Sequence, residues 1–334
     1  MTILHASNTS AGNNQNSSII SGNSSFARMG NEEFTTSSSL WAPTSFTVNP
    51  TNGLIEVDLP SAQERIWAAM NHYTPQSSGH TGLFMSFTDS TGNNAISVFF
   101  QSNTLQLRYW NGSVWIQITE AVSTRHNTIN GRFNVHIRLH ATEGFIRVYR
   151  GEILVLHYTG NTIFNSVSQI TKVRFHMSST IQTSIAELLV STKKTIGKRC
   201  YTATINGAGV SNNFTSGIWS AVDDENVNTS TLDTDFMEST TSGQIAYLAL
   251  DNLANTALPI HAVAINARAL KSAGSPESIS LGIRVGGVDY HGADQSLPTV
   301  YTSRKEVWNF NPNTAAPWVA ANIPSLEAIV RSRP

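Results

Sequence analysis

Residues 132–158 read RFNVHIRLHATEGFIRVYRGEILVLHY. Apolar and polar side chains alternate from Phe133 to Leu139, and a second apolar run follows a break at residues 142–144. A period of two with one apolar face is typical of a half-buried antiparallel strand. Gly-containing breaks at 142–144 and 150–152 have the composition of turns. We therefore predict a three-stranded meander that folds back on itself.

The polar face of this meander carries His136, Arg138 and His140. Two histidines four residues apart on a strand are separated by roughly 13 Å, which is too far to hold one metal ion together. We interpret them, with His157 and His176, as solvent-facing strand histidines, and we interpret the meander as scaffold.

Composition indicates an all-β protein and excludes some functions. The 334 residues contain 21 Lys+Arg and 22 Asp+Glu, and charged residues make up only 13% of the chain. This balance argues against a nucleic-acid-binding surface, which needs a basic excess. The 22 glycines and the many Ser, Thr and Asn residues suit strands joined by turns.

The chain is expected to form an arm and two domains. Residues 1–40 are a polar extended arm, either a disordered leader or a strand-like segment that lies along a neighbouring subunit. Residues 41–195 form a first β-sandwich and residues 196–334 a second one, with a linker at 195–199.

No segment targets the chain to a membrane. The N-terminus lacks a basic region followed by an apolar run, and no run approaches the ~20 apolar residues that cross a bilayer. Cys200 is the only cysteine, so no intrachain disulfide forms. We expect synthesis in the cytoplasm and no membrane insertion.

Two segments leave the secondary structure open. Residues 61–73 have apolar residues at helical spacing but suit an irregular strand equally well. Residues 262–270 are Ala-rich, yet they follow Pro259 and need neighbouring strands to pair with, so we prefer a strand.

A hairpin near residue 110 supplies the candidate binding residues. Leu105–Trp110 and Ser113–Ile118 flank Asn111-Gly112, a pair suited to a two-residue type I′ turn. That turn sets Tyr109 opposite Val114 and Arg108 opposite Trp115. The less apolar face then presents the three candidates for contact with a glycan or a protein partner: Arg108, Trp110 and Trp115.

This hairpin and the following meander, with Ile146-Arg147-Val148-Tyr149-Arg150-Gly151-Glu152, resemble the concanavalin A-like and laminin-G jelly roll. In that family the strand carries a Val-Tyr-x-Asn-Gly pattern, and when the patterns are aligned on Gly151, Arg150 occupies the Asn position. The resemblance covers residues 41–195 and implies a two-sheet β-sandwich with lectin-like binding.

Some members of that superfamily cleave glycans, with a Glu-x-Asp-x-x-Glu signature on one strand. Glu56-Val57-Asp58 matches its beginning, but the third acid would fall at Ser61. Without that acid the proton donor is missing. We therefore expect no enzymatic activity and interpret Glu56 and Asp58 as outward strand residues.

Metal sites have weak support in the sequence. Asp89 with Asn93 and Asn94 offers oxygen ligands for Ca²⁺, although a polar turn explains them. A second acidic group consists of Asp223, Asp224, Glu225, Asp233 and Asp235. We favour a solvated loop over a Ca²⁺ site there, and we expect no cofactor.

The second domain resembles a β-sandwich domain of tailed-bacteriophage virion proteins. The resemblance rests on ordered motifs: Trp219 to Glu225, Leu232 to Phe236, Ala262 to Ala269, Leu281 to Gly287, Val307 to Trp318 and Leu326 to Val330. It implies a structural protein displayed on tail or head, such as a tail-fibre, tail-tip or head-decoration protein. Within this domain Trp308 and Trp318 are expected to be core residues.

Three hypotheses of function follow. The first is a non-enzymatic virion protein that binds host surface glycans through its lectin-like domain. The second is a decoration or adaptor protein whose arm ties neighbouring virion subunits together, in a homo-oligomer such as a trimer. The third, a glycan hydrolase, is disfavoured by Ser61.

Overall fold

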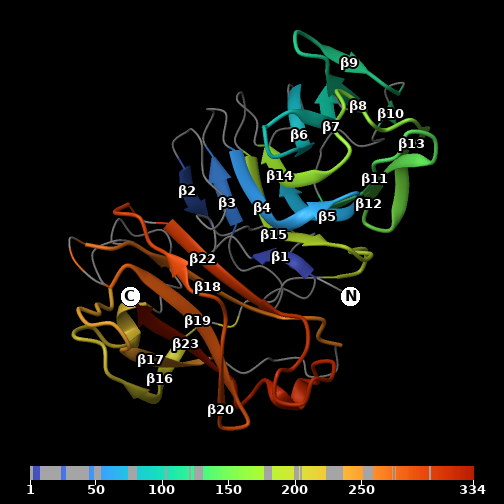
Figure 1. Cartoon of the computed structure of the whole chain (residues 1–334). Coiled ribbons are helices and arrows are strands. Elements are labelled where there is room, and N and C mark those ends of the chain that lie inside the picture. Colours follow the sequence, from blue (N-terminus) through green and yellow to red (C-terminus); the bar gives the residue numbers. More distant parts are fainter. Residues whose placement is uncertain are drawn as a thin grey trace. The chain divides into compact units, whose positions relative to one another are not determined.

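The computed structural model (Figure 1) describes residues 3–7, 24–27, 45–48, 54–73, 81–101, 104–119, 122–123, 131–176, 183–198, 203, 205–222, 236–250, 259–272, 274, 276–300 and 302–334. The chain divides between Cys200 and Tyr201 into two compact units, called here the first and the second unit. Strands dominate both, which confirms the predicted all-β class.

The predicted meander is present in the first unit. Strands β11 (Gly131–Arg138), β12 (Gly144–Arg150) and β13 (Ile153–Gly160) are consecutive antiparallel neighbours. Gly144 starts β12 where two strands approach closely. A Cβ at this position would lie 2.7 Å from the carbonyl oxygens of Gly160 and His140, so the turn needs a residue without a side chain.

The meander is one edge of a sheet that we call sheet A. Its strand order is β13-β12-β11-β5-β15-β3-β2, and β1 also pairs with β15. The remaining strands of sheet A are β5 (Arg65–Tyr73), β15 (Thr183–Ser191), β3 (Ser45–Val48), β2 (Ser24–Ala27) and β1 (Ile3–Ser7).

Strand β5 decides between the two structures left open for residues 61–73. It lies between β11 and β15 and pairs with both along its length. Ile66, Ala68 and Met70 are buried in the core, as alternation in a strand requires. Residues 65–73 are therefore a strand, because two neighbours satisfy their backbone hydrogen bonds, and residues 61–63 form the end of β4 (Leu54–Gln63).

Sheet B forms the other layer of the first unit, with strand order β10-β8-β7-β6-β14-β4 and β9 paired to β8. Its strands are β4 (Leu54–Gln63), β6 (Thr81–Thr88), β7 (Asn94–Gln101), β8 (Thr104–Trp110), β9 (Trp115–Gln117), β10 (Val122–Ser123) and β14 (Ile170–His176).

One hydrophobic core joins the two sheets. Phe133 of β11 and Phe84 of β6 are fully buried, and their rings meet edge to face with centroids 4.9 Å apart. Burying a side chain of this size contributes about 1.5–3 kcal/mol. The first unit is thus a two-layered β-sandwich, as the sequence predicted.

The hairpin of β8 and β9 is present, but the predicted register is wrong by two residues. Tyr109 pairs with Ile116, and Trp110 pairs with Trp115. The loop has four residues because the Asn111 side-chain oxygen accepts the backbone N–H groups of Ser113 and Val114, at 2.9 and 2.8 Å. A shift of two keeps every side chain on its predicted face.

The second unit has its own sheet, with strand order β16-β17-β23-β19-β20 and β21 paired to β19. Its strands are β16 (Ile205–Asn212), β17 (Ile245–Leu250), β19 (Ser278–Val285), β20 (Val288–His291), β21 (Gln295–Ser296) and β23 (Glu327–Arg333). Strands β18 (Val263–Ala269) and β22 (Thr302–Trp308) form a separate ribbon, which confirms a strand at residues 262–270. Two short 3-10 turns, η1 (Trp219–Ala221) and η2 (Ala320–Asn322), complete the unit.

The core of the second unit confirms the prediction for Trp308 and Trp318. Trp318 is 3% exposed and packs with Ile283, while Trp308 packs against the same cluster. The indole N–H of Trp318 donates to the carbonyl of Trp308 at 2.8 Å, so the polar end of the buried ring is satisfied.

Of the predicted arm, residues 3–7 and 24–27 are described. They form β1 and β2, which pair with β15 and β3 of the same unit. The rest of the arm lies outside the described residues, and both interpretations of it stay predictions.

In the part of the chain that the structure describes, no helix has the length and apolar character to span a bilayer.

Candidate functional site

The outer face of sheet A, opposite the core, carries a row of three functional side chains. These side chains belong to Trp67, His136 and Arg147. In each strand the residues before and after them point into the core, so the three side chains point outward, and the strand register places them next to one another. His136 of β11 is the direct cross-strand partner of Trp67 on β5 and of Arg147 on β12. The three side chains therefore stand side by side across the sheet.

Aromatic rings form the floor of this site. The His136 ring stacks on Trp67 with centroids 3.9 Å apart and planes 13° apart, and the Tyr149 ring also stacks on Trp67, with centroids 5.8 Å apart. His136 is only 2% exposed. The expectation of a solvent-facing histidine is wrong here, because the indole beside it covers the ring.

Arg65 is held against this floor by a hydrogen bond. Its Nε–H donates to His136 Nε2 at 2.9 Å, so the neutral imidazole carries its proton on Nδ1. Burial, followed by the positive charges of Arg65 and Arg147, lowers the pKa of His136 to about 3. His136 is consequently neutral near pH 7 and available as an acceptor.

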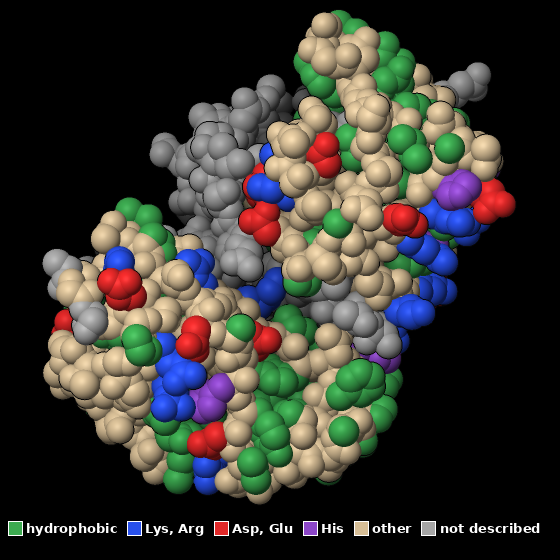
Figure 2. Space-filling model, viewed as in Figure 1, with side chains coloured by type: hydrophobic (Ala, Val, Ile, Leu, Met, Phe, Trp, Pro, Cys, Tyr) green, Lys and Arg blue, Asp and Glu red, His purple; other side chains and the backbone are tan. Residues whose placement is uncertain are grey.

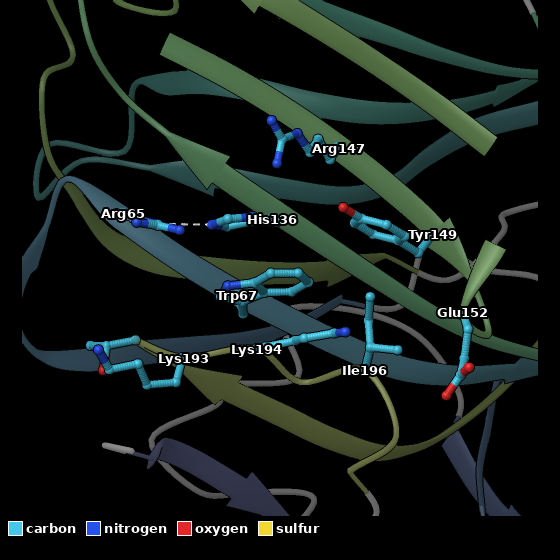
Figure 3. Close-up of a pocket in the computed structure, with 10 residues that line it drawn as sticks. Arg65, Trp67, His136, Arg147, Tyr149, Glu152, Lys193, Lys194 and Ile196 are labelled. Carbon is cyan, nitrogen blue, oxygen red and sulfur yellow. Dashed lines mark hydrogen bonds between the residues drawn. The ribbon is translucent and has the colours of Figure 1, made fainter. Parts of the chain in front are cut away.

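A wall comes from the segment after β15. Thr195 is fully buried, and its hydroxyl donates to the Asn134 side-chain oxygen at 2.9 Å. The residues predicted to begin a linker therefore pack onto sheet A. This packing brings Lys193, Lys194 and Ile196 to the edge of the aromatic floor (Figure 3).

Floor and wall enclose a cleft of about 520 Å³. It is lined by Arg65, Trp67, His136, Arg147, Tyr149, Glu152, Thr192, Lys193, Lys194 and Ile196. A volume of this size is in the range of small-molecule sites. Figure 2 shows basic side chains gathered along the edge of the first unit where the meander lies in Figure 1.

The charge of the cleft is unbalanced. Its lining has four cations, Arg65, Arg147, Lys193 and Lys194, and a single acid, Glu152. Within the described residues none of the four has an ion-pair partner. Basic residues of sheet A outside the cleft differ, since Arg132 pairs with Glu187 at 3.2 Å and Arg138 with Glu143 at 3.4 Å. Among these described residues, the cations without an acidic partner are therefore those of the cleft.

The predicted site residues lie elsewhere, on sheet B. Trp110 and Trp115 form an edge-to-face pair with centroids 5.3 Å apart. Arg108 lies over Phe99 at 3.9 Å and donates to the side-chain oxygens of Gln106 and Gln101. Hydrogen bonds within its own sheet thus occupy the Arg108 guanidinium. Contact of these residues with a partner stays a prediction.

The candidate metal ligands Asp223, Asp224, Glu225, Asp233 and Asp235 lie outside the described residues. Among the residues that are described, no three His, Cys, Asp or Glu side chains are grouped to hold an ion.

Asp89 forms a polar turn. Burial tends to raise the pKa of its carboxyl, but hydrogen bonds from Thr91 and Asn93 outweigh this effect and lower the pKa. These bonds occupy the oxygens that a cation would need.

Glu56 is ion-paired rather than outward in solvent. It is 7% exposed, and its carboxylate lies 2.7 Å from both Lys172 Nζ and Arg174 Nε. Burial tends to raise the pKa of Glu56, but the hydrogen bonds and charges of the two cations lower it below its usual value. A carboxylate held ionised in this way has no proton to donate to a glycosidic oxygen near neutral pH.

Sequence reasoning missed the cleft. Alternation along β5 and β12 could have identified four side chains that point away from the core: Arg65, Trp67, Arg147 and Tyr149. Their convergence required the pairing of β5 with β11, between segments far apart in the chain.

Comparisons with known proteins show no family. No family model matches the chain, and no curated protein matches it. The resemblance to phage virion proteins thus has no support from these comparisons and stays a prediction.

Similar solved structures are distant. They include a sialidase (13% identity, TM-score 0.32, 46% of this chain and 16% of that one) and the globular domain of T. cruzi calreticulin (6%, 0.40, 58% and 89%). A third is the binding domain of botulinum neurotoxin DC in complex with SialylT (13%, 0.37, 86% and 76%). The chain spans less than a fifth of the sialidase. With every TM-score below 0.5, these likenesses carry no argument about function.

Proposed function

We propose that the first unit is a carbohydrate-binding module and that its ligand occupies the cationic cleft on sheet A. The observation that carries this proposal is the combination of an aromatic floor with cations that have no acidic partner. Sugars present C–H faces that pack on aromatic rings, and their oxygens accept hydrogen bonds from Arg and Lys. Tyr149, Arg147 and Lys194 offer both kinds of contact in one cleft.

The activity is binding without turnover. Hydrolysis of a glycoside needs a protonated acid and a second carboxylate across the scissile bond. The cleft lining contains one carboxylate, Glu152, and the ion-paired Glu56 lies on sheet B.

For the whole chain, we propose a structural protein of a tailed-phage virion, made in the host cytoplasm and displayed on tail or head. The ordered motifs from Trp219 to Val330 support this role. The first unit would then bind a host surface glycan, and the chain would assemble with itself and with other virion proteins. The alternative is an adaptor that joins virion subunits through its arm.

A glycan array probed with the full chain tests the binding proposal. A Tyr149→Ala, Arg147→Ala double variant should lose glycan binding, because it removes a floor ring and a donor while leaving the core intact. A Trp110→Ala, Trp115→Ala double variant is the matched comparison, since it removes two rings from sheet B.

The possible results separate the hypotheses. Loss of binding only in the cleft variant supports the proposal, whereas loss only in the tryptophan variant moves the site to the hairpin. Wild-type protein that binds no glycan favours the adaptor. Release of reducing ends from a bound polysaccharide would establish the hydrolase.

A further inference from the structure

We infer that the cleft recognises a sugar with a single anionic group, which lies between Arg65 and Arg147, while the sugar's hydroxyl groups reach Glu152. This inference rests on the proposed glycan binding and adds the class and direction of the ligand. It concerns the two ends of the cleft, which differ in charge (Figure 3).

Two guanidinium groups converge at one end. Both lie over the same ring, because Phe145 is 5.7 Å from the Arg65 guanidinium carbon and 4.5 Å from that of Arg147. Figure 3 shows the two arginines on either side of His136. Both guanidinium groups are positively charged and lie near one ring, so an anionic group bound between them would be attracted by both.

The Arg65 side chain is oriented in advance for such a group. Its Nε–H is occupied by His136, and no hydrogen bond of its two terminal nitrogens is found within the described residues. A guanidinium fixed through Nε presents these terminal nitrogens as a fork, which matches the oxygens of a carboxylate or a sulfate. His136 is therefore a positioning residue for Arg65.

Glu152 marks the other end of the cleft. Figure 3 shows it beyond Tyr149 and Ile196, away from Arg65. An ionised carboxylate repels a second anionic group and accepts hydrogen bonds from hydroxyl groups. A sugar that is acidic at one end and hydroxylated at the other satisfies both ends.

The surroundings of the cleft argue against a polyanion. A sulfated polymer needs a stripe of available cations along its length. On sheet A, Arg132 and Arg138 outside the cleft already pair with Glu187 and Glu143. These two described arginines are therefore already paired, which favours a ligand with one anionic group over a sulfated polymer.

Calorimetry on the full chain tests the inference with matched ligands. The probes are an oligosaccharide ending in a glucuronate, the same oligosaccharide ending in glucose, and a sulfated counterpart. The acidic sugars should bind about tenfold or more tightly than the neutral one, since charged hydrogen bonds are lost with the acid. The carboxylated and sulfated arms show which anionic group fits.

Variants test the direction of binding. Arg65→Gln should remove most of the preference for the acidic sugar over the neutral one. Glu152→Gln should weaken binding of the acidic sugar, because a neutral amide oxygen accepts from hydroxyl groups more weakly than a carboxylate does. It should strengthen binding of inorganic sulfate, because it removes a repelling charge. Arg138→Gln is the graded comparison: Arg138 is the cross-strand neighbour of Arg65 but is paired with Glu143 and does not line the cleft, so its removal should reduce the preference less than Arg65→Gln does.

Equal affinity for acidic and neutral sugars would overturn the inference and leave the proposed glycan binding intact. Binding of none of the sugars would overturn the proposed function itself. Tighter binding of heparin than of any single acidic sugar would replace the single-acid ligand by a polyanion. A Glu152→Gln variant that binds sugar and sulfate as the wild type does would remove Glu152 from the site.

Discussion

Arg65 donates through Nε to His136 Nε2 at 2.9 Å, so a buried imidazole fixes the direction of an exposed guanidinium. The hydrogen bond exists only while His136 is neutral, because a protonated imidazole has no acceptor. Burial of the ring, followed by the positive charges of Arg65 and Arg147, keeps it neutral by lowering its pKa. Protonation of His136 should therefore both destabilise the fold and release the Arg65 side chain from its fixed direction.

The first unit should lose stability in acid through His136 and through His176, which was also expected to face solvent but is half-buried, with its Nε2 2.7 Å from the Ser86 hydroxyl. His136 and His176 both have a pKa lowered from 6.5 to about 3, in each case mainly by burial. Since the unfolded chain binds these protons and the folded one does not, their contribution is complete above pH 6.5 and decreases as the pH falls toward 3. Thermal unfolding measured from pH 7 to pH 4 should show a falling Tm.

The variant His136→Phe shows how much of the fall in Tm at acid pH comes from His136. His136→Phe keeps a ring on Trp67 but has no proton to bind, so its Tm should fall less steeply over the same interval. His157→Gln, at an exposed position of β13, should follow the wild type. Parallel curves for His136→Phe and wild type would remove His136 from this linkage.

The wall of the cleft should depend on one buried hydrogen bond. Thr195→Val keeps the side-chain shape but leaves the oxygen of Asn134 without the donor it has now. Losing a buried partner costs about 1–3 kcal/mol. We expect urea unfolding at lower concentration and faster hydrogen exchange of the backbone amides in residues 192–198. Thr159→Val, at an exposed position, is the control and should change neither measurement.

The contact between the sheets should dominate the stability of the first unit. Phe133→Ala removes a fully buried ring that meets Phe84, and a deletion of this kind typically costs about 3–5 kcal/mol. Ile153→Ala removes a side chain that is 73% exposed and should stay within about 0.5 kcal/mol of wild type. Urea denaturation measures both, and equal effects would contradict a sandwich core at this position.

Sequence reasoning succeeded where a pattern is local. The alternation in residues 132–158 has a period that only a strand satisfies, and the structure contains that meander. The register of the β8–β9 hairpin was predicted wrongly because Asn111 caps a longer loop with its side chain, an interaction that the Asn-Gly pair alone does not reveal.

The cleft could not be predicted in the same way. It depends on which strands become neighbours, and in the chain five of the seven strands of sheet B lie between β5 and β11. The alternation in β11 predicts that His136 points away from the core, but only the position of Trp67 shows that the His136 ring is covered. Lys193 and Lys194 reach the cleft because Thr195 is buried, and no periodicity encodes that burial.

The ion cluster on sheet B should stabilise the first unit in a pH-dependent way. Glu56→Gln leaves Lys172 and Arg174 next to each other without their shared carboxylate. The cations are partly exposed, so solvent screening reduces the loss to about 1–2 kcal/mol at pH 7. Because the pKa of Glu56 is lowered in the folded state, its contribution is present above about pH 4.5 and decreases as the pH falls further. Urea denaturation should therefore separate variant and wild type at pH 7, and the difference should shrink as the pH falls below 4.5. Asp58→Asn is the control, because Asp58 contacts the same Lys172 at 3.2 Å from an exposed position and should change stability little. A Glu56→Gln variant as stable as wild type at pH 7 would show that the two cations do not need this carboxylate.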